Sequence, residues 1–282
     1  MRYYVVIPAY NEQAFIKKTL QSIVAQTLLP TRLIIVDDNS TDDTAAIVQE
    51  YANRYPWISL LRHQSDAIHL PGSKVVQAFQ KGFDTLDQHY DVIIKLDADL
   101  ILPPDYIESL SRHFSADPRT GMVGGFAYIQ KNGNWELENL TNKDHIRGAF
   151  KAYRKACFLE IGGLRPAMGW DTVDELLCHF YGWKVVTDSS LRVKHLKPTG
   201  ASYNKAARYK QGEAFYSLGY GFAITAIASL KLALKKRKPL LFIDYLNGFW
   251  RAKQRGQALL VSKEQAKFIR SYRWKKMFEK LF

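Results

Sequence analysis

The stretch that decides the fold is Asp91-Val-Ile-Ile-Lys-Leu-Asp-Ala-Asp-Leu-Ile-Leu-Pro-Pro104. Its apolar run, Val92 to Leu96, predicts a buried strand that ends at two carboxylates, Asp97 and Asp99. Residues two apart in an extended chain point to the same side, so these carboxylates can share one spot. Two carboxylates about 4 Å apart repel by roughly 4 kcal/mol at an effective dielectric near 20, and a divalent cation removes that repulsion. The expected ligand is therefore Mg²⁺ or Mn²⁺ with phosphate oxygens in its shell; the alternative is a loop with two solvated aspartates.

Strand and helix patterns alternate upstream of this stretch. This alternation predicts a parallel sheet with helices on both faces, and ligands bind beyond the carboxyl ends of such strands. With Val92–Leu96, the expected strands are Tyr3–Ile7, Leu33–Val36 and Ile58–Leu61, and the expected helices are Gln13–Ala25, Thr41–Tyr51 with Ser40 as its N-cap, and Ser73–Leu86.

The alternation fades downstream of Asp99. A turn is expected at Lys131–Asn134, and Gly162-Gly163 ends a short helix. From Ser202 onward the pattern is helical, aromatic and basic. The remaining expected elements are helices at Pro104–Phe114 and Thr172–Tyr181, and strands at Met122–Ile129, Ala149–Tyr153, Val185–Thr187 and Leu191–His195.

Polar residues follow three of the expected parallel strands. The first strand runs into Pro8-Ala-Tyr-Asn-Glu12, the second into Asp37-Asp-Asn-Ser-Thr-Asp42, and the fourth into Asp97-Ala-Asp99. Because parallel strands end at the same edge of a sheet, these clusters predict one site on that edge. Asp37 or Ser40 alone could instead cap the following helix.

Composition limits the class of protein. The 282 residues are 47% apolar, which is enough for a large core, and the net charge is +13. Cys157 and Cys178 lack metal-ligand spacing and are expected to be buried and reduced. Met1 leads directly into a strand pattern, so no signal peptide is expected, and the longest apolar run, Phe222–Leu234, is too short to span a bilayer and is interrupted by Lys231.

The positive charge is concentrated near the C-terminus. Lys235–Lys238 and Arg270–Lys280 are strongly basic, and they flank apolar helix patterns at Phe222–Leu234 and Leu240–Trp250. Such helices can lie in a membrane interface, with apolar faces toward the lipid and lysines toward the headgroups. The alternatives are solvated helix faces, or packing on the rest of the chain or on a second subunit.

Three motifs together resemble family 2 glycosyltransferases. Val5–Glu12, Ile34–Asp42 and Lys95–Asp99 are similar, in order and spacing, to the nucleotide-sugar-binding half of that family. The resemblance implies the GT-A fold, an α/β fold with a Rossmann-like, mostly parallel central sheet flanked by helices. It implies a catalytic domain at residues 1–200, with a nucleotide-sugar half at 1–100 and an acceptor half at 101–200. Residues 201–282 are then a basic helical extension, and Tyr209–Gly219 is similar to tails of members that build bacterial surface polysaccharides.

The resemblance also assigns donor and metal residues. Asp99 is expected to be the main ligand of Mg²⁺ or Mn²⁺, Asp97 to lie near the ribose and the metal, and His195 to complete the metal shell or touch the diphosphate. Lys194 and Lys197, beside His195, also suit a phosphate. Asp38 is expected to read the base edge, and the donor nucleotide is expected to contact Pro8, Tyr10, Glu12, Asp38, Lys74 and Asp97.

The catalytic base is expected in a second acidic region. In the family it ends a Glu-Asp pair about eleven residues before a Gly-aromatic pair; here Gly182-Trp183 leads back to Asp171, but Trp170 replaces the Glu. Asp174 lies three residues later, on the same helix face, and stays a second candidate. Asp171 is favoured by spacing, although it could be a plain N-cap. Trp170 is expected to contact the acceptor through its flat ring, the alternative being a core residue.

The expected function is that of an inverting glycosyltransferase. A carboxylate base activates an acceptor hydroxyl, and a metal stabilises the nucleoside diphosphate leaving group. The expected donor is a UDP- or GDP-sugar, and the expected acceptor is a glycan or lipid-linked molecule in surface polysaccharide or glycolipid synthesis. The expected location is the cytoplasm or the inner face of the membrane.

Two other classes stay open. A metal-dependent nucleotidyltransferase would need a glycine-rich phosphate loop, which Pro8–Glu12 lacks. A non-catalytic, basic nucleic-acid-binding protein fits the net charge, but the acidic strand ends would repel phosphate, so no nucleic-acid partner is expected. A transferase-like scaffold made inactive by Trp170 is a further possibility.

Overall fold

The computed structural model describes residues 1–65, 72–138, 144–197 and 208–279, and the chain divides into two units. Unit 1 comprises Met1–Pro166 and Trp170–Thr199, and unit 2 comprises Ala167–Gly169 and Gly200–Phe282. The boundary expected between residues 200 and 201 lies outside the described residues.

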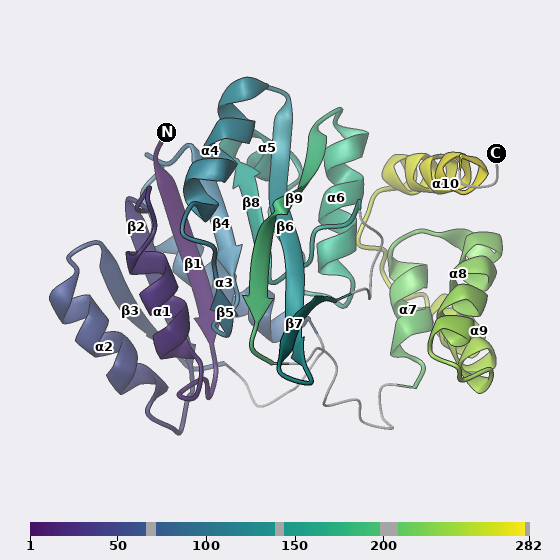
Figure 1. Ribbon diagram of the computed structural model, residues 1–282. Coiled ribbons are helices and arrows are strands. Elements are labelled where there is room, and N and C mark those ends of the chain that lie inside the picture. Colours follow the sequence, from purple (N-terminus) through teal and green to yellow (C-terminus); the bar gives the residue numbers. More distant parts are fainter. Residues whose placement is uncertain (66–71, 139–143, 198–207, 280–282) are drawn as a thin grey trace. The chain divides into compact units, whose positions relative to one another are not determined.

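Four parallel strands form one half of the central sheet of unit 1 (Figure 1). Their order is β3-β2-β1-β4, and every neighbouring pair is parallel. The four strands are β1 (Tyr3–Ala9), β2 (Arg32–Asp38), β3 (Ile58–His63) and β4 (Val92–Leu96). β4 is buried along its whole length and has the bounds that its apolar run predicts.

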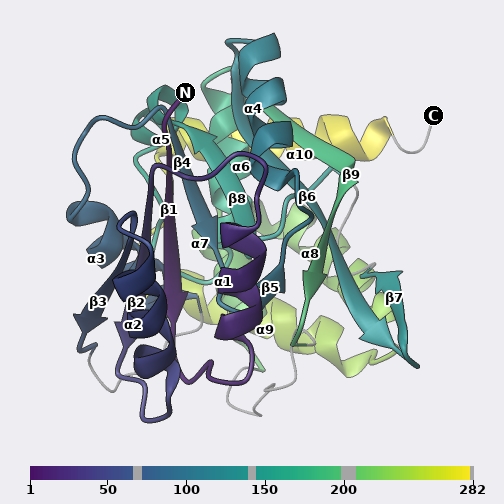
Figure 2. The ribbon, with the colours of Figure 1, turned by 60° about the vertical axis from the view of Figure 1, so that its left-hand side comes forward.

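Helices cover both faces of this parallel half. α1 (Ile16–Val24) and α2 (Thr44–Arg54) lie over one face, and α3 (Ser73–Asp84) lies over the other (Figure 2). A β-carbon added to Gly82 of α3 would lie 2.7 Å from side-chain atoms of both Val6 and Val36, so this glycine allows α3 to approach the sheet closely.

The second half of the sheet is mixed. β8 (Phe150–Arg154) runs antiparallel to β4, and β6 (Thr120–Lys131) runs antiparallel to β8. β9 (Lys184–His195) is parallel to β6, and the short strand β5 (Leu100–Ile101) pairs antiparallel with β9. The remaining elements of unit 1 are β7 (Asn134–Leu137), which forms a hairpin with β6, and helices α4 (Tyr106–Ala116), α5 (Lys155–Glu160) and α6 (Trp170–Phe180).

The prediction of two strands near residues 185–195 was wrong. One strand, β9, continues through this region along β6, and the register is irregular between Gly124 and Phe126. That irregularity accommodates the polar segment around Asp188, whose carboxylate accepts a hydrogen bond from the Ser190 N–H at 2.8 Å. A stretch of irregular register therefore interrupts the apolar pattern without ending the strand.

The prediction that Ser40 caps the second helix was also wrong. α2 begins at Thr44, and the Asp42 carboxylate accepts from the Thr44 N–H at 3.0 Å. The Ser40 hydroxyl instead accepts from the Asn11 N–H at 2.9 Å, which joins two loops. The first helix likewise begins later than expected, at Ile16, because a turn at Glu12–Phe15 precedes it.

Four helices make up the regular structure described in unit 2. They are α7 (Lys210–Ser217), α8 (Gly221–Lys235), α9 (Leu240–Gln254) and α10 (Lys263–Phe278). Gly212 and Gly248 lie where α7 and α9 cross, and an added β-carbon would come within 1.8 Å of Tyr245 O or 2.1 Å of Tyr209 O, respectively. In the part of the chain that the structure describes, none of the helices combines the length and the apolarity needed to cross a bilayer.

Candidate active site

A cavity of about 840 Å³ lies at the carboxyl ends of the parallel strands. The loops after β1, β2 and β4 and the start of α3 supply most of its wall. The cavity contains every residue expected to bind the donor nucleotide and also Asp99. Its lining comprises Pro8, Ala9, Tyr10, Glu12, Asp38, Asn39, Ser65, Gly72, Lys74, Val75, Ala78, Asp97, Ala98, Asp99 and Lys197.

The loops after β1 and β2 are tied together by hydrogen bonds. Asn11 and Asn39 adopt left-handed backbone conformations, with φ of 53° and 64°, which asparagine tolerates better than most residues. The Asn11 side chain accepts from the Thr41 N–H at 2.8 Å, and the Glu12 N–H donates to the Thr44 hydroxyl at 2.7 Å. These bonds fix the wall of the cavity on which Tyr10, Glu12 and Asp38 lie.

Tyr10 and Asp38 differ in their availability to a ligand. Tyr10 is 59% exposed, so its ring is open to stacking. Asp38 is buried, and its carboxylate accepts from the N–H and the hydroxyl of Ser65, at 3.1 and 3.0 Å. Ser65 therefore orients the carboxylate expected to read the base.

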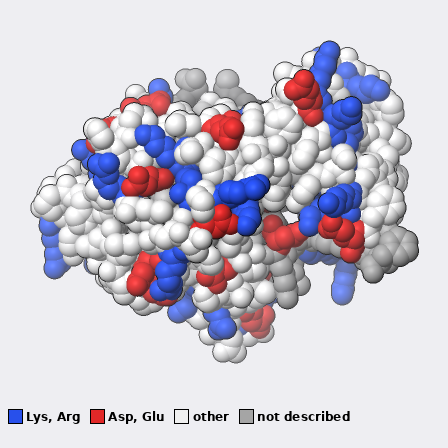
Figure 3. Space-filling view, turned by 90° about the horizontal axis from the view of Figure 1, so that it is seen from above, with Lys and Arg blue, Asp and Glu red and all other residues white. Residues whose placement is uncertain are grey.

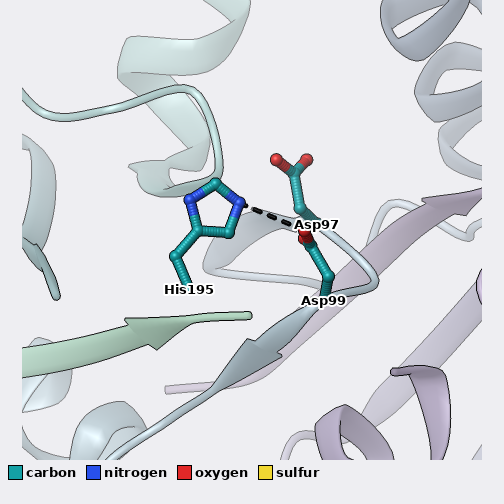
Figure 4. A group of neighbouring side chains, drawn as sticks. All are labelled: Asp97, Asp99 and His195. Carbon is teal, nitrogen blue, oxygen red and sulfur yellow. Dashed lines mark ion pairs between the residues drawn. The ribbon is translucent and has the colours of Figure 1, made fainter. Parts of the chain in front are cut away.

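Asp97, Asp99 and His195 form a cluster of candidate metal ligands (Figure 4). One ligand atom from each lies within 4.8 Å of those of the other two, and His195 Nε2 is 3.3 Å from Asp99 Oδ2. The pairing of β5 with β9 places Leu100 opposite His195, and so brings the histidine to the aspartates. Buried Thr19 shapes the intervening turn by donating to Ala98 O at 2.7 Å and accepting from Leu100 N at 3.0 Å.

The donor set fits Mg²⁺ or Mn²⁺. Carboxylate oxygens and one imidazole nitrogen are typical ligands of Mn²⁺, and carboxylates alone suit Mg²⁺. Ligands on opposite sides of a small divalent cation lie about 4.2 Å apart, close to the spread of this cluster. The His195 nitrogen that faces the carboxylates is Nε2, 3.3 Å from Asp99 Oδ2, so this nitrogen is the one that would join the shell of the ion.

A buried lysine connects the metal cluster to the second half of the sheet. The Lys95 ammonium is paired with the Asp97 carboxylate and donates to Gly148 O at 2.8 Å. The Asp97 N–H also donates to Ala149 O at 2.8 Å. Asp97 is therefore fixed against the segment that leads into β8.

Asp171 lies on the other side of that segment, in the first turn of α6. A β-carbon added to Gly148 would lie 3.1 Å from Asp171 Cβ. The Asp171 side chain is 34% exposed, and a carboxylate is favoured at a helix N-terminus by the helix dipole. Asp171 does not line the cavity, but one glycine separates it from the Lys95–Asp97 pair.

Arg147 provides a second link between the two acidic regions. Burial lowers the pKa of Arg147, and the carboxylates of Asp97, Asp171 and Asp99 act in the opposite direction. One guanidinium thus lies in the field of both the metal cluster and the candidate base. Glu12 also feels Asp99 and Asp97: burial raises its pKa, the ammonium of Lys197 at 2.5 Å lowers it, and the two aspartates raise it.

The structure argues against Asp174 as the base. Its side chain is 1% exposed and accepts from Lys151 Nζ at 2.8 Å and from the Tyr153 hydroxyl at 2.6 Å. Burial raises the pKa of Asp174 against the lowering effect of Lys151. A carboxylate held in this way anchors α6 to β8 and has no open path to an acceptor.

Trp170, which is expected to contact the acceptor, has little surface open to one. Trp170 is 6% exposed and packs on Gly148. The ammonium groups of Lys95 and Lys151 lie 5.4 and 5.9 Å from its ring centre, within cation–π range. Where the family pattern has a glutamate, an aromatic face thus lies beside two buried cations.

Sequence reasoning missed three charged residues of this region. Lys95 had a usable signal, because a lysine inside a buried strand needs a partner. Arg147 and His145 had no such signal, because they lie in the connection between β7 and β8, where the sequence has no helix or strand periodicity.

Comparison with known proteins places this chain in a family. Residues 4–166 match the family model described as glycosyl transferase family 2. The chain belongs to this family. It is 29% identical over 185 residues to the O-antigen chain rhamnosyltransferase RfbN of Salmonella typhimurium, covering 58% of this chain and 55% of that protein. It is 31% identical over 113 residues to the chondroitin synthase of Escherichia coli, covering 40% of this chain and 15% of that protein. The chain thus spans about half or less of the length of these relatives.

Solved glycosyltransferase structures confirm the GT-A fold. The mannosyltransferase PcManGT from Pyrobaculum calidifontis, in complex with GDP-Man and Mn²⁺, gives a TM-score of 0.59 at 16% identity and covers 98% of this chain and 80% of its own. The complex of Staphylococcus aureus TarS 1–349 with UDP-GlcNAc gives a TM-score of 0.59 at 17% identity, and the match covers 95% of this chain and 78% of the TarS chain. This family 2 chain therefore has the architecture that its three motifs predict.

Proposed function

We propose that this protein is a metal-dependent, inverting glycosyltransferase that uses a nucleotide-diphospho-sugar. The observation that carries the proposal is the joint placement of the Asp97–Asp99–His195 cluster beside the cavity and of Asp171 across Gly148 from Asp97. Inversion needs one base and one site for the leaving group, and this arrangement offers both.

The residues divide the reaction between them. Tyr10 stacks on the nucleobase and Asp38 accepts from its edge, while Lys74 and Lys197 at the cavity wall attract the diphosphate oxygens. Asp171 accepts the proton of the acceptor hydroxyl while the oxygen of that hydroxyl bonds to the anomeric carbon. The bond from the anomeric carbon to the diphosphate breaks on the opposite face. Asp97, Asp99 and His195 would hold Mg²⁺ or Mn²⁺, which would supply positive charge to the leaving diphosphate.

The donor is a UDP- or GDP-sugar, and the acceptor is a glycan or a lipid-linked saccharide. Similarity to an O-antigen rhamnosyltransferase and to a chondroitin synthase supports a place in surface polysaccharide or glycolipid synthesis. The complexes of neighbouring structures with GDP-Man and UDP-GlcNAc support both nucleotide classes.

A panel of nucleotide sugars tests this proposal. Purified protein with Mn²⁺ and each donor is assayed for released nucleoside diphosphate, and thermal shifts with UDP and GDP are compared with and without Mn²⁺. Stabilisation that needs both nucleotide and metal, with release from one donor that Asp171→Asn abolishes, is the expected result. Stabilisation by an oligonucleotide alone would point to a nucleic-acid binder.

The two rival classes receive less support. The loop from Pro8 to Glu12 contains no glycine, which disfavours nucleotidyl transfer. On the face drawn in Figure 3, basic side chains are intermixed with acidic ones and do not form one continuous basic surface. The cavity also contains Glu12, Asp38, Asp97 and Asp99, which would repel a nucleic-acid backbone.

We also propose that α8 and α9 bind the surface of an anionic membrane. The two helices pack together, and the rings of Phe222 and Trp250 lie 5.5 Å apart. Exposed lysines and one arginine, Lys235–Lys238, connect the helices. The large apolar side chains left 42–69% exposed are Phe222, Ile227, Leu230 and Leu234 on α8 and Leu240, Ile243 and Trp250 on α9. The apolar side chains suit contact with the lipid chains, and the basic turn beside them suits contact with anionic headgroups.

Vesicle flotation tests the membrane contact. Vesicles that contain anionic lipid should bind the protein, and neutral vesicles should bind it less. The double variant Leu234→Ser, Leu240→Ser should lower binding, whereas Leu159→Ser, a similarly exposed leucine of unit 1, should not. Equal binding to both vesicle types, or self-association through this face in place of vesicle binding, would contradict the proposal.

A further inference from the structure

We propose that His145 is a positioning residue for Asp171, bridging it to the buried carboxylate of Glu175; this inference rests on the proposed function. His145 Nδ1 is 2.9 Å from Glu175 Oε2, and Nε2 is 3.8 Å from Asp171 Oδ2. The imidazole thus has one nitrogen on each carboxylate. Its side chain is only 17% exposed, so the protein and not solvent sets its orientation.

Glu175 is a rigid anchor for this histidine. One of its oxygens accepts from the Ile146 N–H at 2.8 Å and lies 3.2 Å from Lys151 Nζ. Burial raises the pKa of Glu175, but the charge of Lys151 and the hydrogen bond from His145 outweigh it, and the net shift is downward. The carboxylate therefore stays ionised and holds the Nδ1 side of the ring.

The charge state of His145 follows from the groups that face it. Burial lowers its pKa, the hydrogen bond and charge of Glu175 raise it, Lys151 on β8 lowers it, and Asp171 raises it. The net shift is upward, so the imidazolium is favoured. Because both nitrogens of an imidazolium carry hydrogen, only this form directs an N–H at both Glu175 and Asp171.

This arrangement assigns His145 a function distinct from filling space. Asp171 projects from the first turn of α6 with its side chain one-third exposed, and on its own it would sample several rotamers. An imidazolium that is fixed by Glu175 and paired with one oxygen of Asp171 limits that sampling and leaves the other oxygen for the acceptor hydroxyl. Outer-shell contacts that orient a functional carboxylate commonly change activity by about 10- to 100-fold.

Two amide variants separate positioning from packing. The amide nitrogen of Asn approximates Nδ1 of histidine, and that of Gln approximates Nε2. His145→Asn should keep the bond to Glu175 but lose the contact with Asp171, and kcat should fall roughly 10-fold or more with donor KM nearly unchanged. His145→Gln should recover part of the loss, and His89→Asn, at an exposed histidine, should change neither constant.

The pH profile and NMR add readouts that a purely structural role would not move. Wild-type kcat should fall as pH rises through the pKa of His145, and this limb should be absent in His145→Asn. By NMR, the pKa of His145 should drop in Asp171→Asn and drop further in Glu175→Gln, which needs no turnover. If Asp171→Asn leaves that pKa unchanged, or if His145→Asn keeps the wild-type kcat and profile while Asp171→Asn is inactive, the inference is wrong. If the wild type turns over no donor, although the pKa of His145 still drops in Asp171→Asn, the proposed function is wrong. The contact between His145 and Asp171 would then have no catalytic role.

Discussion

Gly148 separates Asp97 and Asp171 by the thickness of one backbone segment. Its carbonyl accepts from Lys95, the partner of Asp97, and its α-carbon faces the β-carbon of Asp171, which a methyl group at this position would approach to 3.1 Å. The distance between the candidate metal site and the candidate base thus depends on the absence of a side chain at residue 148.

Gly148→Ala should therefore impair catalysis more than donor binding. The added methyl would meet the Trp170 ring at 2.6 Å, and this ring is buried and cannot turn aside. We expect a loss of about 1–3 kcal/mol in the free energy of unfolding, typical of overpacking, and a lower kcat as the start of α6 is displaced. Urea denaturation and steady-state kinetics measure both. Gly133→Asn, where an added β-carbon meets nothing within 4 Å, is the control and should leave kcat unchanged.

Asp99→Asn should abolish the metal-dependent part of nucleotide binding. With the wild type, UDP or GDP at 100 times its dissociation constant stabilises the fold by about 2.7 kcal/mol, and this increment should need Mn²⁺. The variant should melt at the same temperature with and without Mn²⁺ when nucleotide is present. Asp84→Asn, on the exposed side of α3, serves as the matched control. A variant that retained the Mn²⁺ increment would remove Asp99 from the metal site.

Asp171→Asn should lower kcat with little effect on stability, whereas Asp174→Asn should mainly lower stability. Replacing Asp171 removes the base and should lower kcat by about 10²- to 10⁴-fold, while stability stays within about 0.5 kcal/mol of wild type. Replacing Asp174 leaves Lys151 without its closest buried carboxylate, which costs about 3–5 kcal/mol. Thermal melts and kcat for the two variants distinguish the roles, and a stable, inactive Asp174→Asn would reverse the assignment.

The stability that His145 contributes should depend on pH. Because its pKa is higher in the folded protein than the value of about 6.5 for a free histidine, this contribution is fully present below that value. It should be lost as pH rises through the higher, folded-state pKa. The unfolding free energies of wild type and His145→Asn, from urea titrations, should accordingly differ more near pH 6 than near pH 9. A gap that widens with rising pH would contradict the raised pKa.

The parallel half of the fold was predictable because its signals are local. β4 has the bounds of its apolar run, and strand ends such as Asp97–Asp99 follow directly from where such runs stop. β5 and the continuity of β9 were not predictable, since a two-residue strand has no periodicity, and the irregular stretch near Asp188 resembles a strand end. Their pairing depends on contacts between segments distant in the sequence.

The donor cavity was likewise predictable from local signals, whereas the acidic region around α6 was not. Tyr10, Asp38 and Lys74 reach one cavity because each lies at the end of a parallel strand or at the start of a helix on one edge of the sheet. Around α6, the sequence pattern indicated three neighbouring candidates, and only burial distinguishes Asp171 from Asp174 and Trp170. Burial there is decided by Lys151, on β8, which no local pattern connects to α6.

The hydrogen bonds between the loops after β1 and β2 have a consequence for attempts to change donor specificity. Each loop depends on the other for its left-handed turn, through Asn11 and Ser40 in particular. If one loop were replaced by that of a relative, its hydrogen-bond donors and acceptors would lose their partners on the other loop. The two loops would therefore have to be exchanged together. Evolution within the family is subject to the same constraint, and we expect substitutions at these positions to arise in compensating pairs.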